Sequence, residues 1–233
     1  MHVLDRPIWS ALTTRQERLA QVNGPARRFP PEMAPFADME DFSPAAFSAL
    51  HGLIRPGETV VLFTEAPVAP PPQFRCLLAA FGEQMIGTPA EVRSSPPLLA
   101  LTEEDAPAMR ELAEIANPGP FGPRTHELGS FLGIKIGGRL AAMTGERMTP
   151  GRYTEMTAVC VHPDFRRRGY AQALLAAIAR GILSRGEIPF LHVFSDNAAA
   201  IALYKRQGMT VRRRLHVTVL GRAGDSIKRP IPH

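Results

Sequence analysis

Apolar residues are spaced most regularly in the second half of the chain. After Gly169 they recur with the period of a helix that buries one face, at Ala173, Leu174, Ala177, Ile178 and Ile182. A second helix is expected over 198–207, where Gly208 ends it. β-rich runs lie on both sides of that helix, at 189–195 and 210–220. The pattern therefore predicts helix, strand, helix and strand in succession.

Before this alternation the pattern predicts three consecutive strands. Residues 131–136 and 140–144 flank Gly137-Gly138, a pair typical of a tight β-hairpin. A turn at 149–151 leads into a long β-rich run over 153–161. The three segments are expected to form a meander.

One strand and one helix precede the meander. Residues 98–101 are a short apolar strand, and Thr102 opens a capping box with three acidic residues in the first turn of a helix over 103–116. The run Asn-Pro-Gly-Pro at 117–120 ends this helix. The order of elements over residues 98–220 predicts an α/β domain with a mixed sheet.

The first 88 residues are weakly patterned. A short helix is expected between Ser10 and Gln21, and Ser43 can cap a second helix over 44–53 with proline at its first position. Residues 59–64 read as a strand, and 84–86 as a second short strand. This region is expected to be a small α/β unit, and no catalytic motif is recognised in it.

Proline clusters mark the joints between these regions. One cluster lies at 67–72 and another at 89–97. Because proline lacks an amide donor and restricts the preceding residue, such clusters are typical of linkers. We therefore expect two domains, residues 1–95 and 96–233, with the boundary near 89–97.

Composition and charge narrow the function classes. The 233 residues contain no apolar run long enough for a membrane span and no leader-like N-terminus, so a cytoplasmic location is expected. The two cysteines, Cys76 and Cys160, lie in apolar surroundings and are expected to be buried and reduced; no metal site is expected. Residues 1–95 carry a net charge of −2 and residues 96–233 a net charge of +7, which favours an anionic partner for the second half.

The segment between the long strand and the helix at 169 carries the chemistry. A strand ends at Val161, a short loop with Arg166, Arg167 and Arg168 follows, and a helix begins at Gly169. Free amides in the first turn of a helix, together with its dipole, bind anions. Because glycine lets a phosphate approach the backbone closely, this loop is suited to a pyrophosphate. The alternative is a solvated surface turn in which Gly169 serves only as a turn residue.

Two motifs in this region resemble a known family. Arg166-x-x-Gly169-x-Ala171 resembles the Arg/Gln-x-x-Gly-x-Gly/Ala signature of the GNAT N-acetyltransferase superfamily. Asn197-x-x-Ala200-x-x-x-Tyr204-x-x-x-Gly208-Met209 resembles the pattern on the family's next strand-helix unit. Alanine replaces the third small residue, and Met209 replaces the usual phenylalanine. The resemblance covers about residues 98–220 and implies a GNAT-like, mostly antiparallel mixed sheet flanked by helices.

The resemblance implies an acetyl-CoA site where the sheet splays. The residues it assigns to acetyl-CoA are Val159, Cys160 and Val161 on the strand, Arg166, Arg167, Arg168, Gly169, Tyr170 and Ala171 in the loop, and Asn197. The strand backbone pairs with the pantetheine arm like an added strand. Asn197 is also a candidate N-cap for the helix that follows it.

Catalytic roles follow from the same resemblance. Glu155 lies eleven residues before Arg166, where histone-acetylating members of the family have a catalytic glutamate, and it is a candidate base for deprotonating the amine. Tyr204 matches the family tyrosine that protonates the leaving thiolate. Both residues also have structural interpretations: Glu155 as a polar residue near the start of a strand, and Tyr204 as a residue that packs the helix onto the sheet.

The function expected is transfer of an acetyl group from acetyl-CoA to a primary amine of a small molecule, amino acid or peptide. A non-catalytic acyl-CoA-binding or sensing module is the first alternative, and a nucleic-acid binder the second. The latter lacks interleaved exposed aromatic residues, and no membrane partner is expected. The identity of the acceptor, a homodimer, and the role of residues 1–95 as a degenerate copy, a lid or a dimerisation arm stay open. The weaker site candidates are Phe121, His126, Glu127, His162, His192 and Arg212 to Arg214.

Overall fold

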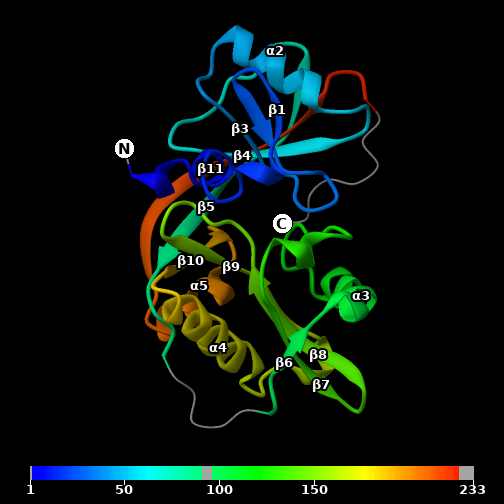
Figure 1. Cartoon of the computed structure of the whole chain (residues 1–233), viewed down its shortest axis with the longest axis vertical. Coiled ribbons are helices and arrows are strands. Elements are labelled where there is room, and N and C mark those ends of the chain that lie inside the picture. The colour runs from blue at the N-terminus through cyan, green and yellow to red at the C-terminus, as the bar shows by residue number, and fades with distance from the viewer. Residues whose placement is uncertain (1, 91–95, 226–233) are drawn as a thin grey trace.

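The computed structural model describes residues 2–90 and 96–225, and an eight-stranded sheet is its centre (Figure 1). In spatial order the strands are β4 (Thr59–Thr64), β11 (Thr210–Arg222), β5 (Phe74–Ile86), β10 (Ile188–Phe194), β9 (Tyr153–Val161), β8 (Arg139–Glu146), β7 (Phe131–Ile136) and β6 (Leu99–Leu101). Neighbouring strands are antiparallel except for β9 and β10, which are parallel. The expected mixed, mostly antiparallel sheet is confirmed.

Helices cover both faces of the half of this sheet formed by β6 to β10. On one face lies α4 (Tyr170–Ser184), whose Leu174 packs against β7 and β8 and whose Leu175 contacts the β9 and β10 side. The shorter α5 (Ala198–Arg206) packs on the same side, where its Tyr204 belongs to the same hydrophobic cluster as Leu175. The opposite face is covered by α3 (Ala106–Ala116), which packs on β8 and β9. The period-3.6 pattern after Gly169 thus corresponds to the buried face of α4.

The first half of the chain adds a second, smaller layer. A three-stranded sheet of β1 (Gln21–Asn23), β2 (Ala26–Arg28) and β3 (Ala37–Met39) packs with α1 (Pro7–Leu12) and α2 (Pro44–Leu53). Helix α2 and strands β1 and β3 lie at the top of Figure 1. Ser43 caps α2 as expected, since its hydroxyl accepts from the amide of Ala46 at 3.2 Å.

The larger sheet crosses the boundary expected from the sequence. Strand β5 lies before that boundary, yet it pairs with β10 over five residues and with β11 along almost its full length. Strand β4 then pairs with the outer edge of β11. The second half of the chain therefore depends on the first for the strand that joins β10 to β11.

Local expectations are mostly confirmed. Both glycines of the hairpin have positive φ, Gly137 at 58° and Gly138 at 80°, as a tight two-residue turn requires. The capping box at Thr102 forms, although its first turn is a 3-10 turn. The helix expected between Ser10 and Gln21 was misplaced, because α1 begins at Pro7 and only a 3-10 turn follows it at 17–19.

Two further expectations need correction or qualification. The short strand expected at 84–86 is the end of the 13-residue β5. Cys76, expected to be buried, is exposed on β5, whereas Cys160 is buried and both thiols are free. Burial raises the pKa of Cys160 to about 12, which makes it an inert thiol. Among the described helices none combines the length and apolarity that crossing a bilayer requires.

Candidate functional site

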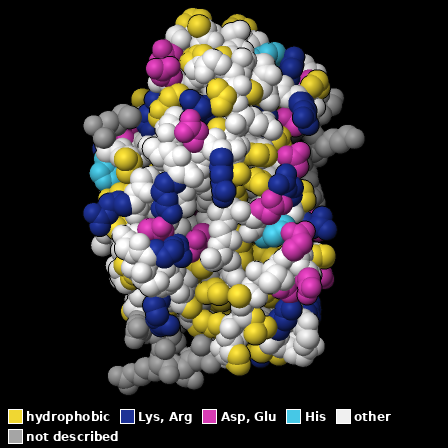
Figure 2. Space-filling view, in the orientation of Figure 1, with side chains coloured by type: hydrophobic (Ala, Val, Ile, Leu, Met, Phe, Trp, Pro, Cys, Tyr) yellow, Lys and Arg dark blue, Asp and Glu magenta, His cyan; other side chains and the backbone are white. Residues whose placement is uncertain are grey.

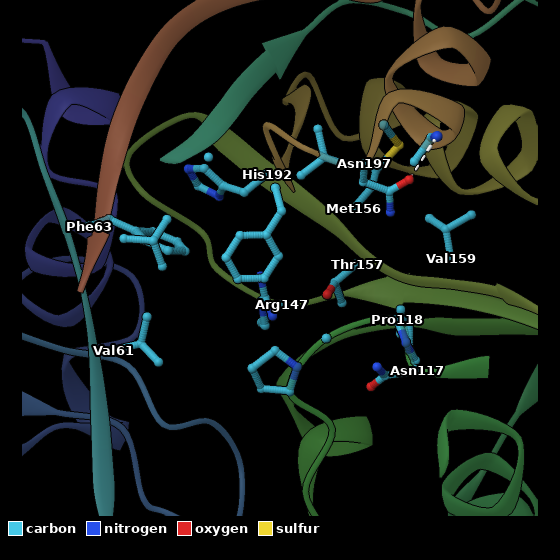
Figure 3. A pocket seen from close by; sticks show the side chains of 18 of the residues that line it. Val61, Phe63, Asn117, Pro118, Arg147, Met156, Thr157, Val159, His192 and Asn197 are labelled. Carbon is cyan, nitrogen blue, oxygen red and sulfur yellow. Dashed lines mark hydrogen bonds between the residues drawn. The ribbon is translucent and has the colours of Figure 1, made fainter. Parts of the chain in front are cut away.

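Strands β9 and β10 separate after a short stretch of pairing. They pair only from Tyr153 to Glu155 on β9 and from Ile188 to Phe190 on β10. Beyond this point β9 stays with β8, and β10 stays with β5. A cavity of roughly 200 Å³ opens between the two strands (Figure 3). The family resemblance implied a cleft between these two strands.

A backbone irregularity lies on the cavity wall. Ala158 has φ 51°, in the left-handed region that residues with a side chain rarely adopt. The pairing with β8 shifts register here, with Cys160 opposite Met143 and Thr157 opposite Gly145. The extra residue in β9 is a β-bulge, and strained backbone of this kind is concentrated at functional sites.

The arginine turn leads directly into α4. Arg167 has φ 61° and Gly169 φ 77°, so the chain turns twice through the left-handed region before the helix begins at Tyr170. No side chain among residues 2–90 and 96–225 caps this end of the 15-residue helix, and Arg166, Arg167 and Arg168 are all exposed. Uncapped first-turn amides that follow three exposed arginines have the chemistry that an anion requires.

Asn197 and Tyr204 line the same cavity from α5. The Asn197 side chain accepts a hydrogen bond from the amide of Ala200 at 3.1 Å, so it is an N-cap whatever else it binds (Figure 3). Tyr204 is buried, and its hydroxyl hydrogen-bonds no residue that the structure describes. Burial raises the pKa of Tyr204 to about 12, so the hydroxyl keeps its proton at neutral pH.

Glu155 is fully buried in an ion pair. Arg147 donates to it through Nε and Nη2, both at 2.8 Å, and His192 Nδ1 lies 2.7 Å from its Oε1. Burial alone would raise the pKa of Glu155, but the charge and hydrogen bonds of Arg147, with those of His192, lower it to about 2. A carboxylate with so low a pKa is a weak base at neutral pH.

The ion pair fixes the orientation of His192. Because an ionised carboxylate only accepts hydrogen bonds, Nδ1 of His192 donates to Glu155 and Nε2 accepts. Its donor is the Gln84 amide at 3.0 Å, whose oxygen accepts in turn from Arg212 at 2.8 Å. Arg212 also binds Asp5 at 2.6 Å, so a continuous polar chain runs across β9, β10, β5 and β11 from Glu155 to Asp5.

The second wall of the cavity comes from the first half of the chain. Phe36, Val61 and Phe63 line it together with residues of β11 (Figure 3). The sequence interpretation missed these residues and Arg147, since neither a motif nor a short-range spacing connects them to the GNAT signatures. The tertiary fold alone brings these residues together. Phe36 forms a β-bridge with Val61, and the guanidinium of Arg147 lies over the Phe36 ring.

The remaining candidates lie apart from this cavity. His162 and Arg139 are 2.6 Å apart beside the arginine turn, and Phe121 packs on Phe131. His126 and Glu127 lie close enough to Glu103 to share an ion, but Glu127 already binds Arg124 through both oxygens. Arg212 to Arg214 are engaged by acidic residues rather than by solvent alone.

Comparisons with known proteins agree with this geometry. The model of the FR47-like protein family matches residues 131–217. A ribosomal protein bS18-alanine N-acetyltransferase of Salmonella typhimurium is 30% identical over 141 residues, which cover 57% of this chain and 94% of the relative. The N-alpha-acetyltransferase RimI of Mycobacterium tuberculosis is 33% identical over 132 residues, or 50% of this chain and 82% of the relative.

A solved structure resembles nearly the whole chain. An acetyltransferase assigned to the GNAT family, from Novosphingobium aromaticivorans, superposes with a TM-score of 0.88 at 39% identity. The match covers 96% of this chain and 100% of that protein, so it includes the first half that the shorter relatives lack. The chain belongs to the GNAT family of N-acetyltransferases. It is accordingly an enzyme that transfers an acetyl group to an amine.

Proposed function

We propose that acetyl-CoA binds across the gap between β9 and β10 and that its acetyl group passes to a primary amine held at the far end of the same cavity. The observation that carries the proposal is the divergence of two parallel strands directly before an uncapped helix N-terminus. The separation makes room for a pantetheine arm, and the helix end supplies amides for a diphosphate. Val159, Cys160 and Val161 would contact the arm, while the turn from Arg166 to Ala171 would hold the diphosphate.

The chain's own groups have distinct roles in this proposal. The neutral amine forms a bond to the acetyl carbonyl carbon, and the bond from that carbon to sulfur breaks. Sulfur leaves with the electron pair, and the Tyr204 hydroxyl supplies it with a proton or a hydrogen bond. The attacking nitrogen becomes positively charged when it bonds to the carbonyl carbon, and it gives its extra proton to water to leave the neutral amide. Most of the rate enhancement comes from holding amine and thioester together.

For Glu155 we propose a role other than the catalytic base that the family resemblance implied. With its pKa near 2 and both oxygens engaged, it would act through its neighbours rather than deprotonate the amine. We propose that it positions Arg147 and His192 at the cavity wall.

The first prediction concerns the helix end. In Gly169→Asp a carboxylate would face the diphosphate, and we expect acetyl-CoA binding to weaken by at least about 100-fold, the effect of an unfavourable charge next to a desolvated anion. Isothermal titration calorimetry with the folded variant measures this. Gly169→Asn is the matched control, because it adds the same strain at φ 77° without a charge and should weaken binding by about tenfold or less. Equal affinities for the two variants would contradict the assignment of the turn.

The second prediction concerns the acid. Tyr204→Phe removes a hydroxyl that has no partner among the described residues, so the melting temperature should change little. Steady-state kinetics should show kcat lower by about 10- to 100-fold, the usual contribution of one acid catalyst, and a KM for acetyl-CoA within about twofold. An unchanged kcat would exclude Tyr204 from the chemical step.

A further inference from the structure

The cavity extends beyond the strand gap into a chamber that the GNAT signatures do not describe. We call it the acceptor chamber, and its walls are Phe36, Val61, Phe63, Leu215, Val217 and Arg147. Figure 3 shows Val61 and Phe63 on β4 on one side of the cavity, with His192 and Arg147 facing them, and the ring centroids of Phe63 and His192 lie 4.6 Å apart. Since one cavity joins these walls to Tyr204, a molecule in the chamber would lie next to the thioester.

The chamber walls favour an apolar group. Phe36 and Phe63 pack on one another with ring centroids 5.3 Å apart, and Val61, which forms a β-bridge with Phe36, lines the cavity beside them. An aromatic or branched aliphatic side chain would remove apolar surface from water against these walls. A methyl group would leave most of that surface uncovered.

Arg147 presents one free edge to the chamber. Its Nε and Nη2 bind Glu155, and its guanidinium carbon lies 4.4 Å from the ring centroid of Phe36. Nη1, on the edge away from Glu155, has no hydrogen-bond partner among the residues described. Because Glu155 already neutralises this guanidinium, a neutral carbonyl oxygen suits Nη1 better than a carboxylate, which would bring an uncompensated charge into an apolar chamber.

The titratable side chains that line the cavity are not available to deprotonate the acceptor, so an amine that is already neutral near pH 7 is favoured. Among the described lining residues these are Arg147, His192 and Tyr204, and both nitrogens of His192 are already hydrogen-bonded. The acceptor must therefore arrive as a neutral amine. An α-amine, with a pKa near 7.7 to 8.0, is neutral at pH 7 a few hundred times more often than a lysine side chain near 10.4.

We propose that the acceptor is an α-amino amide with a bulky apolar side chain, whose carbonyl oxygen binds Nη1 of Arg147 while its side chain packs against Phe36, Val61 and Phe63. The α-amine then faces the thioester. Such a group occurs in a free amino-acid amide and at the N-terminus of a peptide. The inference rests on the proposed function, and it assigns acceptor selection to the first half of the chain.

Thiol release from acetyl-CoA tests the inference with a matched set of acceptors. Phenylalaninamide should exceed alaninamide in kcat/KM by about 10- to 100-fold, the usual effect of burying a large apolar side chain. Free phenylalanine should be acetylated at least about tenfold more slowly than its amide. A tripeptide amide that begins with phenylalanine then distinguishes a peptide acceptor from a free amino-acid amide. A rate above that of phenylalaninamide indicates a peptide acceptor, and a lower rate indicates a free amino-acid amide.

A chamber-filling variant provides the second readout. Val61→Phe should lower kcat/KM for phenylalaninamide at least about tenfold more than kcat/KM for alaninamide, while acetyl-CoA affinity by calorimetry stays within about twofold. Val211→Phe, the same change at an exposed position of β11, should alter neither. Equal rates for the two amides, or acetyl-CoA binding without transfer to any amide, would overturn the inference and leave the cofactor site standing. Absence of acetyl-CoA binding would instead refute the proposed function.

Discussion

Glu155→Met is expected to lower the free energy of unfolding by about 3 to 5 kcal/mol, the cost of leaving a buried charge without its partner. Glu155 has no exposed surface and Arg147 is 7% exposed, so solvent screens the unpaired guanidinium only weakly. Chemical denaturation monitored by circular dichroism measures the effect. Glu146→Gln is the matched control, because its partner Arg185 is 41% exposed and the loss should be about 1 kcal/mol or less.

A double variant and a pH series separate charge from packing. Arg147→Met combined with Glu155→Met should recover much of the stability, since an apolar pair leaves no charge buried. The pKa of Glu155 is lowered on folding from 4.5 to about 2, so its contribution is complete above about pH 5 and disappears as the pH falls through 2. The stability difference between wild type and Glu155→Met should therefore shrink over this window. A constant difference would show that packing, not the ionised carboxylate, stabilises the site.

A fragment of residues 96–233 is expected not to fold by itself. Without β5, the strand β11 has no partner in the fragment, and β10 becomes an exposed edge. Size-exclusion chromatography and thermal melts should show an aggregated or non-cooperative chain that does not bind acetyl-CoA. The buried contacts of Gln84 with His192 and Arg212 are lost at the same time.

Complementation keeps this prediction testable. Fragments 1–90 and 96–233, refolded together, should associate and recover acetyl-CoA binding, because β5 can pair with both of its neighbours in the complex. A monomeric, cooperatively folded 96–233 that binds acetyl-CoA would contradict the prediction. Residues 1–95 would then be an independent accessory domain, as the proline clusters suggested.

Signals that lie within a few residues of one another could be interpreted from the sequence. The arginine turn, the α4 periodicity and the Gly137-Gly138 hairpin each depend on backbone geometry within one or two elements, and all three form at the expected positions. The splay of the sheet followed from the family resemblance, not from the pattern. Asn197 shows how far local sequence signals go. Its role as a helix N-cap could be predicted from the sequence and is confirmed, whereas its contact with a ligand is still a prediction.

The acceptor side of the cavity could not be predicted in the same way. Arg147 lies in the connection between β8 and β9, and it binds Glu155 of β9. Phe36 and Val61 reach the cavity only because β4 pairs with the outer edge of β11. The sequence interpretation also missed the part of β5 that precedes Gln84, since a charged residue such as Glu83 is unusual inside a central strand. In the fold these side chains satisfy Arg214, Arg212 and His192.

A crystal structure with acetyl-CoA bound tests the central claim most directly. We expect the diphosphate within hydrogen-bonding distance of backbone amides between Arg166 and Ala171, the pantetheine arm beside Val159 and Val161, and the thioester next to Tyr204 at the entrance to the acceptor chamber. Density for acetyl-CoA elsewhere, with the turn before α4 left empty, would contradict the account.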